Sequence, residues 1–359
     1  MNDLTNQDLF HRIAVLLNTA RHRAVQAVNT TIVHTYFEIG RMIVEDEQQG
    51  ENRAEYGKQQ LKFLSQNLTK QFGKGFSERN LKNMRQFYLS YSQQRLLLND
   101  VSGGSHFRQT VSAELSNKNT NRQTLSSEFT LSWSHYQKLM RIDDPYERRF
   151  YEIEATKNNW SLRELERQYD TALFARLALS KDKDEIRALA LKGQIIEKPE
   201  DLIKDPYILE FLGLPEHHSY SENELEQKLI DKLEHFLLEL GAGFTFVGRQ
   251  ERITFDEQHF YIDLVFYNRL LRCFVLIDLK IGKLKHQDIG QMQMYVNYYD
   301  RKIKLSDENK TIGIILCQDK SQSVVEFTLP DDNQQIFASK YMTVLPSKET
   351  LIQLIDEER

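Results

Sequence analysis

Apolar residues recur at helical spacing through the first part of the chain. Over residues 8–48 the spacing, seen for example at Ile13 and Leu17, predicts a long amphipathic helix. A second helix is predicted over residues 56–71, and the two glycines of the following segment, FGKGF, end it. Ser77 can then N-cap a third helix, SERNLKNMRQFYLSY. The pattern predicts an all-helical domain of the winged-helix or helix–turn–helix type.

A polar segment follows these helices. Residues 101–128 are rich in Ser, Asn and Thr and only weakly periodic, which predicts a long exposed loop or insertion. Helical spacing returns with LSWSHYQKLMRI, and SLRE at residues 161–164 is a capping box that opens a further helix. We therefore predict a helical domain over residues 1–180 and a charged linker over residues 181–205.

From residue 206 onward the pattern changes to mixed helix and strand. Ser221 and Glu224 form a capping box for a helix that runs through Leu240 to Gly241. Three strand-like runs come next: FTFVGRQERITF, FYIDLVFYN and LRCFVLIDLK. A helix, HQDIGQMQMYVNYYD, and another strand, TIGIILC, complete an α-β-β-β-α-β order. This order predicts an α/β or α+β domain with a mixed sheet over residues 206–359.

Composition limits the class of protein. The chain has 359 residues, of which 40% are hydrophobic and 28% charged, as in soluble proteins of two or three domains. We find no secretory signal pattern and no apolar run near the roughly 20 residues that cross a bilayer, so no membrane contact is expected. Cys273 and Cys317 lie in strand-like runs and are predicted to be buried thiols rather than a disulfide or a zinc site. A cytoplasmic location fits these features.

Charge is distributed unevenly. The formal net charge is −5, but residues 52–99 carry nine Lys or Arg and two acids, a local net of +7. Such a segment indicates a polyanion partner, although a solvated helix face has the same composition. Six side chains near the predicted third helix have the chemistry to reach phosphates and base edges of DNA: Lys74, Arg79, Lys82, Asn83, Arg85 and Gln86.

Three charged residues interrupt the most hydrophobic hairpin, residues 261–280. They are Asp263, Asp278 and Lys280. A turn centred between residues 270 and 271 places Asp263 opposite Asp278, and a turn one residue earlier makes the two diagonal. Either register puts both carboxylates on one face of the sheet, roughly 5–8 Å apart at Cβ. Lys280 follows Asp278 by two residues and shares that face.

Two carboxylates this close repel each other unless a cation joins them. Oxygen ligands without a His or Cys cluster favour Mg²⁺ or Mn²⁺. Glu226 projects within the apolar stripe of the preceding helix and would supply a third acid, whereas Glu239 projects elsewhere. On the later helix, Gln291 shares a face with Tyr295 and can point back toward the same place. The alternative interpretation is a simple buried salt bridge.

An acid and an acid-x-lysine on a hairpin, with a helix acid before and a glutamine after, resemble the PD-(D/E)XK nuclease superfamily. The wider segments LEQKLIDKLEHFLLELGAGFTFVGRQ and YGKQQLKFLSQNLTKQFGKGFSERNLKNMRQFY are similar to the YhcG family of bacterial proteins. The resemblance covers about residues 12–350. It implies a restriction-endonuclease-like C-terminal domain joined to a DNA-binding helical domain.

The resemblance also implies roles for individual residues. Five catalytic positions map onto this chain: Glu226, Asp263, Asp278, Lys280 and Gln291. The three acids among them would bind Mg²⁺ or Mn²⁺. As a separate hypothesis, which the resemblance does not supply, Gln291 and Gln250 would position backbone phosphates. The motif proline is replaced by Ile262, a departure that the superfamily often shows.

We therefore expect a metal-dependent, endonuclease-like phosphodiesterase acting on DNA, in DNA processing or in defence against phage and mobile elements. The alternative is a catalytically inactive or partner-dependent DNA-binding component of a larger defence or recombination complex. A homodimer would suit the cutting of two strands. The sequence has no G-x-S-x-G motif, P-loop or Cys/His nucleophile constellation, which argues against a metal-free hydrolase.

Overall fold

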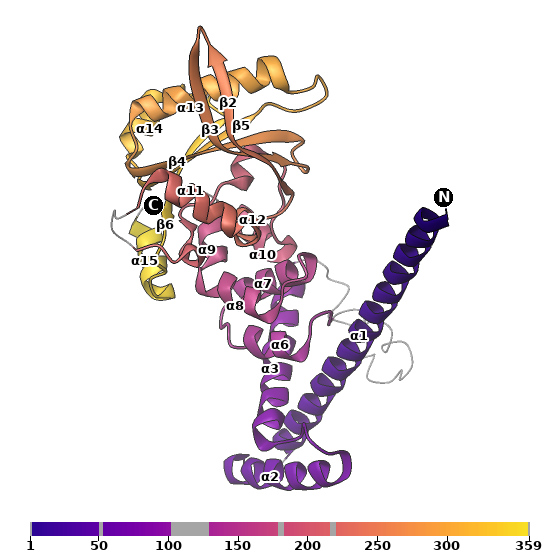
Figure 1. The fold of residues 1–359 in the computed structure, drawn as a ribbon. Coiled ribbons are helices and arrows are strands. Elements are labelled where there is room, and N and C mark those ends of the chain that lie inside the picture. The colour runs from indigo at the N-terminus through magenta and orange to yellow at the C-terminus, as the bar shows by residue number, and fades with distance from the viewer. Residues whose placement is uncertain (1, 50–52, 102–128, 179–182, 216–219, 358–359) are drawn as a thin grey trace. The chain divides into compact units, whose positions relative to one another are not determined.

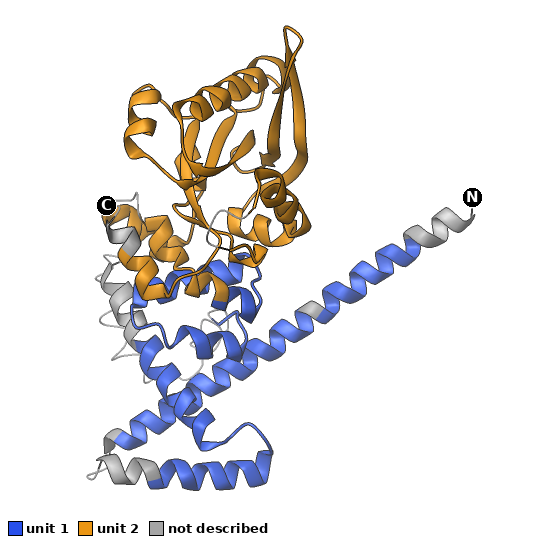
Figure 2. Ribbon diagram, turned by 60° about the vertical axis from the view of Figure 1, so that its left-hand side comes forward, with its two compact units in different colours: residues 1–166 blue, residues 167–359 orange. Residues whose placement is uncertain are grey.

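The computed structural model describes residues 2–49, 53–101, 129–178, 183–215 and 220–357 (Figure 1). The chain divides into two compact units, residues 1–166 and residues 167–359 (Figure 2). None of the described helices is long and apolar enough to cross a membrane.

Unit 1 is helical throughout its described residues. Its helices are α1 (Asn2–Gln49), α2 (Arg53–Phe72), α3 (Glu78–Val101), α6 (Trp133–Leu139), α7 (Pro145–Lys157) and the start of α8 (Leu162–Asp170). The three predicted N-terminal helices are confirmed. Ser77 accepts a hydrogen bond at its Oγ from Asn80 N at 3.3 Å, as expected of the N-cap of α3. Helix α7 was not predicted, although Asp144 caps it by accepting from Tyr146 N at 2.8 Å.

Aromatic rings form the centre of unit 1. Phe87 of α3 contacts Phe37 of α1 at a ring-centroid distance of 5.6 Å, and it contacts Phe129 and Tyr136 at 5.1 Å each. No strand occurs among the described residues of this unit, so α2 and α3 offer a helix–turn–helix pair without a wing. The predicted polar loop lies outside the described residues, apart from residue 101, which ends α3.

Unit 2 contains a six-stranded mixed sheet and helices on both of its faces. Its elements are the end of α8, α9 (Leu173–Ala178), α10 (Lys183–Lys192), η2 (Pro199–Leu202), β1 (Tyr207–Ile208), η3 (Glu210–Leu212), α11 (Glu222–Asp231), α12 (Leu233–Leu240), β2 (Phe244–Phe255), β3 (Gln258–Asn268), β4 (Cys273–Lys283), α13 (His286–Tyr298), η4 (Tyr299–Ile303), β5 (Ile312–Asp319), α14 (Gln322–Thr328), β6 (Ile336–Met342) and α15 (Lys348–Glu357). The strand order is β1-β6-β5-β4-β3-β2. The β2–β3 and β3–β4 pairs are antiparallel and the remaining pairs are parallel.

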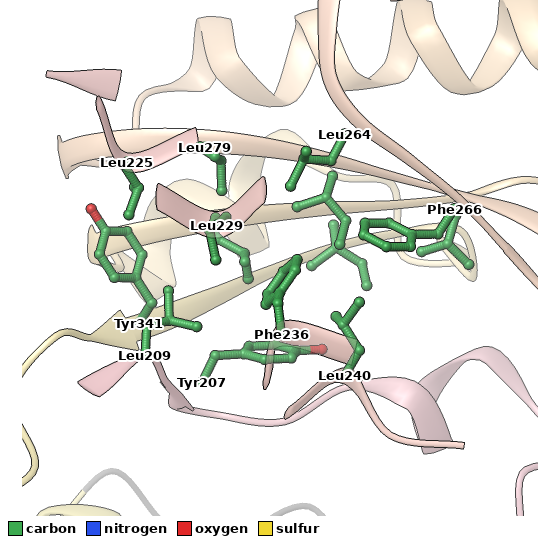
Figure 3. Packing of buried hydrophobic residues seen from close by; sticks show 14 of the residues in the cluster. Tyr207, Leu209, Leu225, Leu229, Phe236, Leu240, Leu264, Phe266, Leu279 and Tyr341 are labelled. Atoms are coloured by element: carbon green, nitrogen blue, oxygen red, sulfur yellow. The ribbon is translucent and has the colours of Figure 1, made fainter. Parts of the chain in front are cut away.

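Alternation along β4 sends side chains to two separate cores. Val275 and Ile277 face α11 and α12, where Leu229 and Phe236 cover them, and Figure 3 shows these two helix residues among the packed side chains of that core. Leu276 faces the opposite side, toward α13. The sheet is therefore buried on both faces, and a charged side chain in the middle of β4 must find its partners inside the protein.

The strand cysteines behave as predicted. Both Cys273 and Cys317 are buried free thiols. Burial raises the pKa of each thiol to about 12, which keeps both neutral.

The helix predicted to run from Ser221 to Leu240 is in fact two helices. Lys232 leaves the helical conformation, with φ −118° and ψ 30°, and separates α11 from α12. Glu239 was predicted only to project outside the apolar stripe of this helix, and the angle of 100° per residue could not show that a distant segment covers it there. Glu239 is fully buried and forms an ion pair with Arg176, whose Nη1 lies 2.6 Å from its Oε1.

The segment predicted as a linker, residues 181–205, contains helix α10 and the 3₁₀ helix η2. By compactness the two units separate earlier, between residues 166 and 167. The buried Lys204 at the end of this segment donates to the carbonyl of Glu239, which fastens the segment to α12.

Candidate active site

The β3–β4 hairpin has the first of the two predicted registers. Leu264 pairs with Ile277 and Asn268 pairs with Cys273, so the turn centres between residues 270 and 271. Asn268 shapes the turn, since its Oδ1 accepts from Leu270 N at 3.0 Å and Leu271 N at 3.1 Å. Continuing the same pairing places residue 263 opposite residue 278.

The backbone ladder stops just before these two acids. In place of a further strand pair, Leu279 N donates to Asp263 Oδ2 at 2.7 Å. The carboxylate of Asp263 is thus fixed at the point where β3 and β4 separate. Its second oxygen, Oδ1, accepts from Gln250 Nε2 at 3.1 Å.

Asp278 is the most buried acid of this group, with 1% of its surface exposed. Its Oδ2 lies 2.9 Å from Lys280 Nζ but accepts no hydrogen bond of normal geometry. Burial, and then the neighbouring charge of Asp263, raise the pKa of Asp278 to about 7. An acid with this pKa is only partly ionised at neutral pH, and it would gain from a cation.

Lys280 lies between two acids. Its Nζ is 4.0 Å from Glu222 Oε2 as well as 2.9 Å from Asp278 Oδ2. Burial alone would lower the pKa of Lys280, but Asp278 raises it above its ordinary value. Lys280 therefore carries a positive charge at neutral pH and supplies charge rather than a free base.

Glu226 joins the group from helix α11. The carboxylate is buried, with 6% of the residue exposed, and Gln250 Nε2 donates to its Oε2. Burial raises the pKa of Glu226, and Asp263 raises it further. One amide group of Gln250 therefore bridges Glu226 and Asp263, and the backbone of Gln250 has a left-handed φ of 50° that non-glycine residues rarely adopt.

Within the described residues Gln291 forms no hydrogen bond with the acids themselves, and its contact near them is with Tyr295. Gln291 Nε2 donates to the hydroxyl of Tyr295, which donates to the carbonyl of Tyr261 at 2.9 Å. Burial raises the pKa of Tyr295, and the charge of Asp278 contributes to the rise. The sequence interpretation missed Tyr295 as a member of the site, although its i, i+4 spacing from Gln291 places both on one face of α13.

Glu222 is a second residue that sequence reasoning left outside the site. Besides its contact with Lys280, it accepts at Oε1 from Ile281 N at 3.2 Å. The sequence offered one indication of this role: Glu222 lies in the first turn of α11, four residues before Glu226, and so on the same side of the helix.

Among the described residues, no group of three or more His, Cys, Asp or Glu side chains is placed so that it could hold a metal ion as it stands. The chemistry of the carboxylates around Gln250 and Lys280 nevertheless suits a hard divalent cation. Three carboxylates belong to this group without a Cys or His side chain among them. Burial, and then the charge of Asp263, raise the pKa of the other two, Glu226 and Asp278. The Oδ2 atom of Asp278 is buried and accepts no hydrogen bond. Oxygen ligands of this kind prefer Mg²⁺ or Mn²⁺. In this structure the side-chain amide of Gln250 and the ammonium group of Lys280 face the carboxylates in the way that such an ion would.

The N-terminal candidates in unit 1 differ in availability. Lys74, Arg79 and Lys82 are exposed and form no ion pair with another described residue. Arg85 is half-buried, and its Nε lies 2.7 Å from Glu47 Oε2. The remaining two are Asn83, which is half-buried, and Gln86, which is exposed and donates to Ser90 Oγ at 3.1 Å.

Comparisons with known proteins agree across both units. Two family models match the chain: the YhcG PDDEXK nuclease domain over residues 200–355 and the DUF1016 N-terminal domain over residues 12–176. The protein named "Putative nuclease YhcG" of Escherichia coli (strain K12) is 40% identical over 350 residues, which cover 96% of this chain and 92% of that protein.

Solved structures give weaker likenesses. The crystal structure of a repair endonuclease from Pyrococcus abyssi is 16% identical, and the match covers 36% of this chain and 50% of that one, with a TM-score of 0.26. A structure of an EndoMS–dsDNA2 complex is 12% identical with the same coverage and TM-score. The matched part spans about half the length of these solved chains.

Proposed function

Because the chain belongs to the YhcG family, whose C-terminal domain is a PD-(D/E)XK nuclease domain, we propose that it hydrolyses phosphodiester bonds of DNA in a divalent-metal-dependent reaction. The observation that carries the proposal is the convergence of Asp263, Asp278 and Lys280 where β3 and β4 separate. The test is cleavage of DNA by the purified protein in Mg²⁺ or Mn²⁺, compared with EDTA.

Each residue has a role in this reaction. Glu226, Asp263 and Asp278 would hold the metal ion, which when bound polarises a phosphoryl oxygen and lowers the pKa of a bound water. Lys280, protonated beside Asp278, would stabilise the negative charge that develops on the phosphate. Gln291, held in place by the hydroxyl of the buried Tyr295, would orient the strand at the edge of the site. Exposed cations of unit 1 would add non-specific DNA affinity that falls with salt.

One feature of the site favours a partner-dependent form of this activity as the second candidate. The amide of Gln250 lies between Glu226 and Asp263, where it satisfies both carboxylates without a metal. A DNA strand or a protein partner that withdraws Gln250 would open the acids to the ion. In that case the isolated chain binds DNA and cuts it only after the partner is added.

Removing the Gln250 bridge gives a prediction that does not depend on cleavage. Gln250→Ala leaves Glu226 and Asp263 without their shared donor, so we expect the variant to lose about 1–2 kcal/mol of folding free energy in EDTA. Mg²⁺ should restore more stability to this variant than to the wild type, because the ion replaces the lost positive end. Thermal unfolding in EDTA and in Mg²⁺ measures both effects. An equal Mg²⁺ response in the two proteins would contradict the assignment of this place to a cation.

Helix α1 supplies the surface for the homodimer that we propose. Nine large apolar side chains between residues 9 and 32 are exposed in unit 1: Leu9, Phe10, Ile13, Val15, Leu16, Leu17, Val25, Val28 and Ile32. The alternate 3 and 4 spacing of Phe10, Ile13 and Leu17, continued by alanines at 20, 24 and 27, is the heptad pattern of a helix that pairs with its own copy. The nine exposed side chains together present several hundred Å² of apolar surface. This area is of the same order as the roughly 800 Å² that each partner buries in a stable complex.

Acidic substitutions at the heptad positions of α1 test the proposed dimer. Ile13→Glu with Leu17→Glu should convert the protein to a monomer, because two buried carboxylates would face their copies. Light scattering after size-exclusion chromatography measures the mass. The matched control, Gln26→Glu on the polar face of α1, should stay dimeric. A monomeric wild type at micromolar concentration would refute the proposal.

A further inference from the structure

A recess lies beside α13 at the edge of the core between this helix and the sheet, where Phe255, Met294 and Tyr298 pack. Its volume is about 470 Å³. The lining combines two aromatic rings, two amides and two cations with a glycine and a methionine: Phe255, Gly290, Gln293, Met294, Asn297, Tyr298, Arg301 and Lys302. We call this recess the α13 pocket. In Figure 1 α13 runs beside the β2–β3 hairpin, which supplies Phe255.

No contact within the described part of the chain requires a glycine at position 290. Gly290 lies in the middle of α13 and is exposed, and a Cβ atom added to it would meet nothing within 4 Å. Glycine is unfavourable inside a helix relative to alanine. Its use at a position with open space is understood if something outside the chain approaches the helix backbone closely.

The aromatic and amide groups of the α13 pocket suit an unpaired base. Phe255 and Tyr298 meet edge to face, with ring centroids 5.5 Å apart and an angle of 86°. Gln293 and Asn297 lie one helical turn apart on the same side. Aromatic faces stack bases, and side-chain amides bond to base edges that pairing leaves free.

The cations of the α13 pocket suit the phosphates of the same strand. Arg301 and Lys302 project from η4, a π-helical turn of the kind that occurs often at functional sites. Both are exposed, and neither has an ion-pair partner in the described part of the chain. The nearest acid in sequence, Asp300, is engaged elsewhere, since its Oδ1 accepts from Thr311 N at 2.8 Å and its Oδ2 from Gln335 at 2.9 Å.

We propose that the α13 pocket binds an unpaired nucleotide of a nucleic-acid strand. The inference rests on the proposed nuclease function and narrows its substrate to DNA with single-stranded character. Gln291 follows Gly290 directly in α13 and contacts Tyr295 at the candidate active site. The α13 pocket and Gln291 therefore belong to one helix, and a bound strand would run along it toward the acids.

Two variants of the full chain test the proposal, with binding measured in EDTA. Gly290→Leu places a larger side chain in the α13 pocket, so affinity for a short single-stranded DNA should fall about tenfold. Leucine also favours the helix more than glycine does, so the Tm should rise by about 2 °C. Arg301→Ala with Lys302→Ala should weaken the same binding about tenfold and lower the salt slope by about 2. Affinity for a blunt duplex of the same sequence should change less. The control, Lys232→Ala at the α11–α12 break on the other face of the sheet, should match the wild type.

A local readout separates the α13 pocket from unit 1. An oligonucleotide carrying 5-iodouracil, irradiated in complex with the full chain, should crosslink to the peptide that contains Tyr298, and Gly290→Leu should abolish that crosslink. DNA binding and cleavage that both variants leave unchanged, without this crosslink, would overturn the pocket and leave the nuclease proposal intact. A wild type that neither binds nor cuts any DNA would overturn both.

Discussion

Replacing Asp278 by asparagine should abolish metal-dependent DNA cleavage, with a loss on the order of 10³-fold or more. The substitution keeps the shape of the side chain but removes the charge that would bind the ion. It also removes the partner that keeps Lys280 oriented at 2.9 Å. DNA binding should change little, because exposed cations in both units carry that affinity in our account.

The Asp278 result needs a folded variant and a matched control. Glu222 remains 4.0 Å from Lys280, so the ammonium keeps one acidic neighbour when Asp278 is neutral. Asp231→Asn makes the same chemical change at an exposed position on α11, where the carboxylate accepts a hydrogen bond from Gln227 at 2.8 Å, and this variant should cut DNA like the wild type. Metal-dependent cleavage retained by Asp278→Asn would refute the assignment of the active site.

Replacing Glu239 by glutamine should lower the free energy of unfolding by about 3 kcal/mol. Glu239 is fully buried and accepts from Arg176 at 2.6 Å and from Ile208 N at 3.0 Å. Burial alone would raise its pKa, but Arg176, Lys204 and Arg167 together lower it from 4.5 to about 2. Glutamine leaves the buried guanidinium of Arg176 without a counter-charge. Urea unfolding at neutral pH measures the loss.

The pH dependence of this loss follows from the sign of the shift. A carboxylate whose pKa is depressed in the folded state stabilises the protein above its unfolded value of 4.5, and that stabilisation is lost as the pH falls toward 2. The stabilities of wild type and Glu239→Gln should therefore converge over this range. Glu234→Gln, at an exposed position on the same helix, is the control and should change little. A constant difference from pH 7 to pH 2 would contradict the role of the Glu239 charge.

The sequence predicted the parts of the site that depend on strand periodicity. Alternation along β4 puts the odd-numbered residues from Cys273 to Leu279 on one face of the sheet and Asp278 on the other. The position of the turn then decides whether Asp263 lies opposite Asp278. The turn itself was left between two registers, because the choice depends on Asn268 capping the backbone of residues 270 and 271. The sequence therefore predicts which residues share a sheet face, because strand alternation alone fixes that geometry.

Other features depend on contacts between distant segments, which no local pattern contains. Glu239 is buried against Arg176, which lies 63 residues earlier in the chain. Gln250 bridges Glu226 and Asp263 from a left-handed backbone conformation inside β2. The segment VGRQER contains no pattern that predicts this conformation. Gln250 was predicted as a phosphate contact, and in the structure it lies among the candidate metal ligands.

The most direct measurement of the account is a cleavage assay with the wild type and Lys280→Ala. Each protein is incubated with linear duplex, single-stranded and four-way-junction DNA, in Mg²⁺, Mn²⁺ or EDTA. We expect the wild type to cut in the presence of the ion and not in EDTA, with DNA of single-stranded character preferred, and Lys280→Ala to lose that cutting. Cleavage that survives EDTA or the loss of Lys280, or a wild type that cuts none of the three DNAs with either ion, would contradict it.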